Sequence, residues 1–234
     1  MQNKTITKSE IKRIIREILF LITTATLFLS AIYAISGMLG AKDGKVRSDF
    51  TLMLSQCTLG AVGMILPFLI ERYLHFCVPS GVRAVYFAFI YCAIFLGEVL
   101  SFYYIIPFWD DILHAASSVM LTALGISIAN HLCRNNAARV RLSPALLCFF
   151  AFEFAVSVGV LWEIYEFSFD AILGLNMQKF RTAGGDLLIG KEALFDTMKD
   201  LIVDTATALV TSLAIYVNLR KESRNGYTRN KKAR

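Results

Sequence analysis

The chain lacks the local signatures of the common soluble enzyme classes. Its 234 residues contain no G-x-x-x-x-G-K-[ST], no H-E-x-x-H and no G-x-S-x-G, so no phosphate-binding loop, zincin or serine hydrolase is indicated. The five cysteines include no C-x-x-C pair. A zinc-cysteine site or a disulfide framework is therefore unsupported, and the cysteines are expected to be small buried apolar residues.

Charge is also missing from long stretches of the chain. Hydrophobic residues make up 56% of the sequence and the mean hydropathy is +0.56, both above the values of an ordinary soluble domain. Residues 18–40 and 50–70 carry no charge, and each is long enough to cross a hydrocarbon core of roughly 30 Å. Four less pure apolar stretches follow, at 84–106, 112–133, 145–173 and 196–219. We therefore predict an all-α polytopic membrane protein with six transmembrane helices.

The basic residues predict how this bundle is oriented. Most Lys and Arg fall on the side that holds both termini. The positive-inside rule places this side in the cytoplasm. We therefore predict a multi-pass protein of a bacterial cytoplasmic (inner) membrane. The predicted organisation is a basic arm at 1–17, a transmembrane domain at 18–219 and a basic tail at 220–234. The net charge of +6 is then a consequence of topology. No nucleic-acid partner is predicted, because no nucleic-acid-binding domain accompanies the tail.

Acidic residues enter the last three helices at helical spacing. The three groups are Asp110, Asp111 and His114; Glu163, Glu166 and Asp170; and Asp196, Asp200 and Asp204. Ionisable groups in a spanning helix are costly, face the bundle interior and are functional by default. With the orientation above, all three groups come to the extracytoplasmic ends of their helices. The sequence therefore predicts one buried acidic site near that face.

A divalent metal ion would be an economical counter-charge for such a site, because clustered carboxylates repel one another. Oxygen ligands with one imidazole suit Mg, Mn or Ca, and a His–carboxylate set also suits Zn. The predicted catalytic groups are Glu163, Glu166 and Asp200. The predicted metal ligands are Asp111, His114, Glu163, Glu166, Asp196, Asp200 and Asp204.

Each acidic group also has a purely structural explanation. Asp110 and Asp196 could be interfacial residues, since a helix N-terminus favours an acid there. Asp170 at a helix C-terminus could belong to a surface loop, and Lys199 could neutralise an aspartate in place of a metal. The deeper acids could form a satisfied network that only packs helices together. The loop at 174–195, with Gly184–Asp186 at its centre, is either an ordinary turn or a cover for the site.

Three segments of the C-terminal half carry a family resemblance. WDDILHAASSVMLTALGIS from Trp109, GVLWEIYEFSFD from Gly159 and FDTMKDLIVDTATAL from Phe195 resemble the uncharacterised YjdF-like bacterial inner-membrane family, and they are loosely similar to VanZ-like membrane proteins. The resemblance covers residues 109–209 and implies no established reaction. The motif positions that it carries over are Asp111, His114, Glu163, Glu166, Asp196 and Asp200.

These observations leave three functions open. The first is a metal-dependent membrane enzyme acting on a lipid-linked or small-molecule envelope precursor. The second is a cation- or proton-coupled small-solute transporter, in which Glu153 would continue the path from Glu163 and Glu166. The third is a non-catalytic membrane factor. The lipid bilayer is the one partner that all three require.

Overall fold

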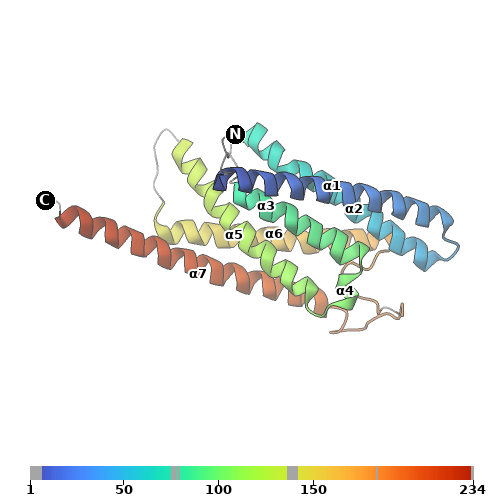
Figure 1. Cartoon of the computed structure of the whole chain (residues 1–234). Helices are drawn as coiled ribbons and strands as arrows, with labels where there is room; N and C mark the ends of the chain where they lie inside the picture. Colours follow the sequence, from blue (N-terminus) through green and yellow to red (C-terminus); the bar gives the residue numbers. More distant parts are fainter. Residues whose placement is uncertain (1–6, 75–77, 79, 136–141, 183, 233–234) are drawn as a thin grey trace, which may run out of the picture. The chain divides into compact units, whose positions relative to one another are not determined.

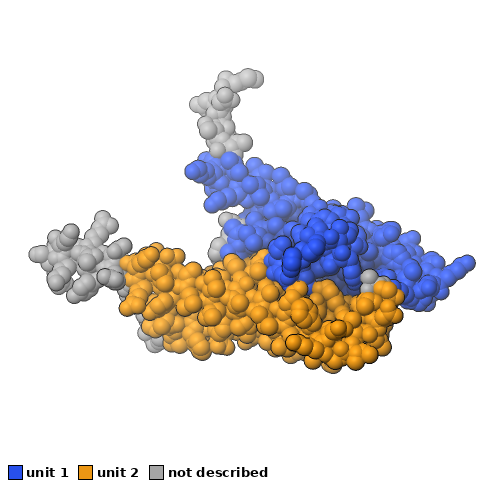
Figure 2. Space-filling view, turned by 90° about the horizontal axis from the view of Figure 1, so that it is seen from below, with its two compact units in different colours: residues 1–113, 169–175 blue, residues 114–168, 176–234 orange. Residues whose placement is uncertain are grey.

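The protein consists mainly of long helices (Figure 1). In the computed structural model the described residues are 7–74, 78, 80–135, 142–182 and 184–232, so the start of the predicted arm and the end of the predicted tail lie outside them. Six helices are long and apolar enough to cross a membrane, and the described residues contain no strand. The predicted all-α, six-helix architecture is confirmed. The chain divides into two compact units, shown in Figure 2: Met1–Leu113 with Phe169–Leu175, and His114–Ser168 with Asn176–Arg234.

The first unit begins with two long antiparallel helices, α1 (Lys8–Gly40) and α2 (Gly44–Leu74). α1 starts where the sequence offers a capping box: the Glu10 amide donates to Thr7 Oγ1 at 3.2 Å, and Glu10 Oε2 accepts from the Thr7 amide at 2.8 Å. Two otherwise unpaired backbone groups at the helix start are thereby satisfied. The helix interior is apolar enough to continue through the predicted first span.

The third predicted helix, 84–106, is not continuous. It consists of α3 (Ser80–Ile90), a π-helix η1 (Tyr91–Val99) and the short α4 (Phe102–Ile105). The Leu100 amide bonds the Phe95 carbonyl at 2.9 Å in the wider π pattern, and Ser101 adopts a left-handed φ of 59° that a helix cannot continue through. Apolar content alone could not locate this break, because π-helices have no hydropathy signal.

An apolar core holds the first unit together. Its buried residues come from α1, α2, α3 and η1: Leu27, Cys57, Met64, Phe87, Ile90 and Ile94. Two hydrogen bonds also connect these helices: Thr23 Oγ1 donates to the Phe87 carbonyl at 3.3 Å, and Tyr86 Oη donates to the Gly63 carbonyl at 2.8 Å. Hydroxyl-to-backbone bonds of this kind satisfy polar groups where water is excluded.

The second unit is built from three helices, α5 (Trp109–Asn135), α6 (Pro144–Leu173) and α7 (Phe195–Lys232); the first turn of α5 and the last residues of α6 belong to the first unit. α6 begins at the sequence Ser-Pro, where Ser143 Oγ accepts from the Leu146 amide at 3.2 Å. It ends at Gly174, whose φ of +67° suits a helix C-cap. α7 extends into the residues predicted as the basic tail, as far as Lys232.

Small and polar side chains line the interior of the second unit. The small buried residues on its three helices include Ser118, Thr122 and Ala129; Ala151 and Ala155; and Ala208 and Ser212. A Cβ added at Gly125 of α5 would lie 3.0 Å from Ala151 Cα. Small residues permit this close approach, as expected of membrane helices, and the helices are packed directly against one another.

The outward faces are apolar. Exposed large hydrophobic residues on the second unit include Phe149, Leu161, Ile202 and Val210, which suits contact with lipid. The prediction for the cysteines is confirmed in part: Cys57 and Cys148 are buried, Cys92 and Cys133 are only half-buried, and Cys77 lies outside the described residues.

Candidate functional site

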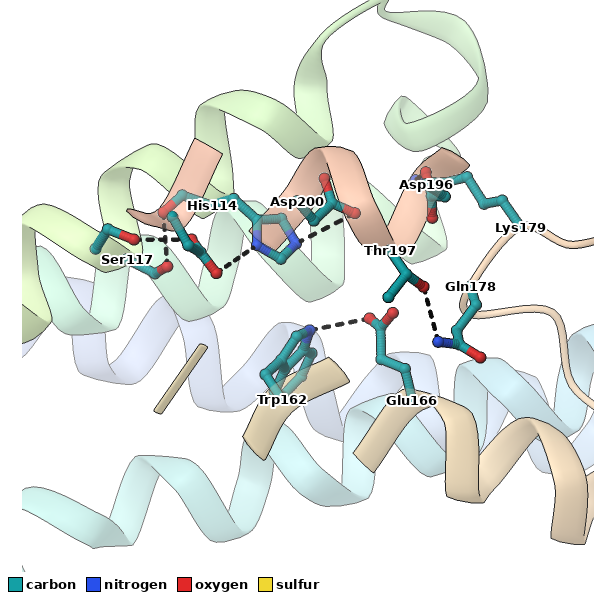
Figure 3. Close-up of polar contacts among 11 residues, drawn as sticks. His114, Ser117, Trp162, Glu166, Gln178, Lys179, Asp196, Thr197 and Asp200 are labelled. Carbon is teal, nitrogen blue, oxygen red and sulfur yellow. Dashed lines mark hydrogen bonds and ion pairs between the residues drawn. The ribbon is translucent and has the colours of Figure 1, made fainter. Parts of the chain in front are cut away.

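A histidine and two aspartates meet inside the second unit. His114 is on α5 and Asp200 is on α7 (Figure 3). Asp204 follows Asp200 by one turn of the same helix. His114 Nδ1 lies 3.2 Å from Asp204 Oδ2, and Ser118 Oγ donates to Asp204 Oδ1 at 2.7 Å. Both oxygens of Asp204 therefore have partners. Where Asp204 is ionised it can only accept hydrogen bonds, and His114 then donates from Nδ1.

The other ring nitrogen of His114 faces Asp200. His114 Nε2 lies 3.8 Å from Asp200 Oδ2, and the Asp200 side chain is only 1% exposed. This separation is too long for a hydrogen bond. Two ligands of one tetrahedral zinc ion stand about 3.4 Å apart, and His114 and Asp200 belong to a group with metal-ligand spacing. These two atoms could therefore share a cation.

Glu163 of α6 brings a third carboxylate to the cluster. It is 5% exposed, and neither carboxylate oxygen has a hydrogen-bond partner among the described residues. The side chains that act on it electrostatically are those of His114, Asp196, Asp204 and Thr197. A buried carboxylate without a bonding partner costs free energy, so this position calls for a proton or a cation.

Gly159 explains how α6 and α7 come so close at this level. A Cβ at Gly159 would lie 2.6 Å from Asp204 Oδ2, a separation that real Cβ atoms do not show. Only glycine allows the α6 backbone to lie against this carboxylate. Gly159 stands one turn before Glu163 on the same face of α6.

A second layer of polar contacts lies toward the N-terminal end of α7. Asp196 Oδ1 pairs with Lys179 Nζ at 3.1 Å, and Gln178 Nε2 donates to Thr197 Oγ1 at 2.8 Å (Figure 3). Glu166 Oε1 accepts from Trp162 Nε1 at 2.9 Å on α6. Asp196 and Glu166 thus have partners outside the His114 cluster.

The remaining predicted acids are placed as follows. Asp110 and Asp111 lie in the first turn of α5 and, like the buried Asp170, belong to the first unit. Asp110 precedes His114 by one helical turn, so both point from one face of α5. Glu153 is exposed on α6, away from the buried face that carries Glu163.

Sequence reasoning gave no chemical role to Ser118, Gly159 or Lys179. Ser118 could have been found from its i+4 relation to His114, which puts both on one face of α5. Gly159 could have been found from its i−4 relation to Glu163. Lys179 lies in an irregular loop, and no periodicity relates such a residue to Asp196.

The sequence matches a family model over residues 16–221, nearly the whole chain; the family is described as predicted membrane protein (DUF2238). The chain belongs to this family. A relative of the DUF2238 chain is an uncharacterised protein of Thermotoga maritima, 31% identical over 156 residues, which are 66% of this chain and 72% of the relative. No solved structure matches the chain.

Proposed function

We propose that this DUF2238 protein is a divalent-cation-dependent membrane enzyme whose site opens to the extracytoplasmic face of a bacterial cytoplasmic membrane. The observation that carries the proposal is the buried Glu163 carboxylate without a hydrogen-bond partner, beside a histidine and two aspartates. An ion among these groups would neutralise them together. We also propose membership of the YjdF-like family, whose motif positions include His114, Glu163 and Asp200. This resemblance implies no reaction.

The geometry favours distinct roles within the cluster. His114 Nε2 and Asp200 are the proposed ligands because they have metal-ligand spacing; Glu163, and Asp110 on the same face of α5, are the further candidates. Asp204 is a positioning residue, because Ser118 and His114 Nδ1 already use both of its oxygens. A carboxylate that accepts from the ring nitrogen not bound to the ion fixes the orientation of a ligand histidine and raises its basicity.

The remaining predicted ligands have weaker claims. Asp196 is paired with Lys179, and Glu166 accepts from Trp162; each would have to exchange a partner to reach an ion. Asp111 lies in the first unit, and its role stays a prediction. Glu163 and Asp200 keep their proposed catalytic roles because they would hold the ion, whereas the catalytic role of Glu166 rests on the sequence pattern.

A bound divalent ion would supply Lewis-acid chemistry toward a phosphate ester or phosphoanhydride. The residues of this chain would orient the site: Asp204 would hold the proton of the neutral His114 ring on Nδ1, which leaves Nε2 to bind the ion, and Ser118 holds Asp204. The substrate class that suits a site at the membrane boundary is a lipid or lipid-linked envelope precursor.

Two observations weigh against a solute path through the second unit. Glu153, which was predicted to extend the acidic path, is exposed. On the other side of the cluster the helices are in close contact at Gly125 and Ala151, so the side chains there leave little room for a solute. An enzyme site that opens on one side needs no such passage.

The test is the metal content of the purified full-length protein, by elemental analysis after dialysis against each of Mg²⁺, Mn²⁺, Ca²⁺ and Zn²⁺. The wild type is expected to retain one divalent ion per chain, and the Glu163→Gln, Asp200→Asn double variant to retain none. A divalent ion should also raise the unfolding temperature of the wild type alone, because it binds the folded state.

The matched control is Glu153→Gln, which removes a carboxylate of the same helix at an exposed position and should leave the metal content unchanged. The proposal would be contradicted if the wild type contained no metal after dialysis against any of the four ions. Equal metal content in the wild type and the double variant would also contradict it.

A further inference from the structure

The loop before α7 has a defined shape. Residues 176–182 and 184–194, here named the hairpin, are tied by backbone bonds from Thr182 to Asp186 at 2.9 Å and from Leu188 to Phe180 at 2.9 Å. The Asn176 side chain bonds both the amide and the carbonyl of Arg181, at 2.9 and 3.0 Å. The hairpin therefore holds its side chains in fixed directions.

The hairpin is also attached to the helix that carries the acidic cluster. Gln178 bonds Thr197, and Lys179 pairs with Asp196, both in the first turn of α7 (Figure 3). These contacts position the hairpin at the end of a membrane-spanning helix. By topology it lies at the boundary between hydrocarbon and water, since it joins two consecutive spans.

Its exposed surface is unusually apolar for a loop. Leu187 and Leu194 are largely exposed and Ile189 is 83% exposed. Phe195 at the start of α7 is also exposed, and the exposed Met198 follows one turn later. The hairpin thus extends the lipid-facing side of α7, and bare apolar side chains in water would be costly.

Basic groups accompany this apolar surface. Arg181 and Lys191 are exposed and form no ion pair with any described residue; the Arg181 guanidinium lies 4.9 Å from the centroid of the Phe180 ring. Lys191 shares a shallow depression with Leu188, Glu192 and Phe195. Asp186 is exposed at the turn, at the opposite end of the hairpin from Lys191.

We propose that the hairpin is a lipid-binding element that lies in the headgroup layer of the membrane. Arg181 and Lys191 contact lipid phosphates, and Leu187, Ile189 and Phe195 enter the upper acyl region. Apolar residues combined with unpaired cations bind an anionic membrane surface through both burial and charge attraction. This inference does not depend on a metal ion. Combined with the proposed function, it would bring lipid phosphates to the end of the helix that carries Asp200.

The test places a fluorophore at single cysteines in the full-length chain, with the native cysteines replaced, in two kinds of proteoliposome. One contains phosphatidylcholine alone and the other phosphatidylcholine with phosphatidylglycerol. At Ile189→Cys we expect strong quenching by lipids spin-labelled near the headgroup, and iodide quenching several-fold weaker than at the matched turn position Asp186→Cys. Phosphatidylglycerol should strengthen the lipid quenching.

A second comparison isolates the cations. Replacing Arg181 and Lys191 together by glutamine should abolish the phosphatidylglycerol effect and leave the unfolding temperature unchanged, because both side chains are exposed. Iodide quenching at position 189 equal to that at 186 would overturn the proposal, since the hairpin would then lie in water. Shielding from both quenchers with energy transfer between labelled chains would also overturn it, in favour of contact with a second copy.

Discussion

At the scale of single residues, the hydrogen bonds around Asp204 decide which nitrogen of His114 faces Asp200. Asp204 accepts from Ser118 on one oxygen and faces His114 Nδ1 with the other. The carboxylate is buried, so each partner offsets part of its desolvation. The consequence is that His114 presents Nε2, and not Nδ1, to Asp200.

The Ser118→Ala variant tests this network. It leaves one buried oxygen of Asp204 without its donor, so the free energy of unfolding should fall by about 1–3 kcal/mol. Cation affinity should fall by roughly 10–100-fold, as is typical when a group that orients a ligand is removed. Denaturant titration in mixed micelles and a cation titration of the unfolding temperature measure the two effects.

Ser168→Ala is the matched control, because Ser168 only donates to the Ile164 carbonyl of its own helix, at 2.7 Å. It should change stability by no more than about 0.5 kcal/mol and leave cation affinity unaltered. Equal effects of the two serine variants would show that the Ser118 hydroxyl does not support Asp204.

At the scale of elements, the approach of α6 to α7 depends on one missing Cβ. Gly159→Ala would put a methyl group 2.6 Å from Asp204 Oδ2, so either the carboxylate or the helix must move. We expect a loss of about 1–3 kcal/mol in stability, as for other overpacked interiors, together with weaker cation binding.

A double-mutant cycle makes this prediction specific. In an Asp204→Ala background the clash is absent, so Gly159→Ala should cost clearly less than in the wild type. Gly81→Ala is the control, because a Cβ there meets nothing within 4 Å and alanine is the better helix former. An equal cost of Gly159→Ala in both backgrounds would contradict the role of Gly159.

Helices and their buried faces were largely predictable from the sequence, and irregular geometry was not. Apolar runs set the six spans, and the spacing of Asp200 and Asp204 put both on one buried face of α7, as the helical period requires. The same period could not separate Glu163, which is buried, from Glu166, which bonds Trp162. That choice depends on which neighbour each helix face meets.

The loops and the interrupted helix show the same limit. The pairing of Lys179 with Asp196 depends on the path of the hairpin, and Lys179 itself adopts a positive φ of 48°. The break at Ser101 follows a π-helix that leaves no trace in hydropathy. Local backbone geometry of this kind is fixed by tertiary contacts rather than by pattern.

At the scale of the whole molecule, the number of spans determines which parts share a side of the membrane. Six helices can cross, and an even number returns the C-terminus to the side of the N-terminus. The hairpin precedes the last span, so we expect it on the other side if all six helices cross. The basic residues at both ends, including Lys8, Lys12 and Arg220, then predict cytoplasmic termini and an extracytoplasmic hairpin.

Paired reporter fusions in a bacterial host check this orientation. Green fluorescent protein joined after Arg234 should fluoresce, because it folds in the cytoplasm, and alkaline phosphatase inserted after Gly190 should be active, because it needs the oxidising exterior. Neutralising the basic residues of the N-terminal arm should weaken the preference, since those charges resist translocation. The reverse pair of signals would put the acidic cluster at the cytoplasmic face, where an extracytoplasmic lipid precursor could not reach it. The orientation therefore bears directly on which substrates the proposed site can meet.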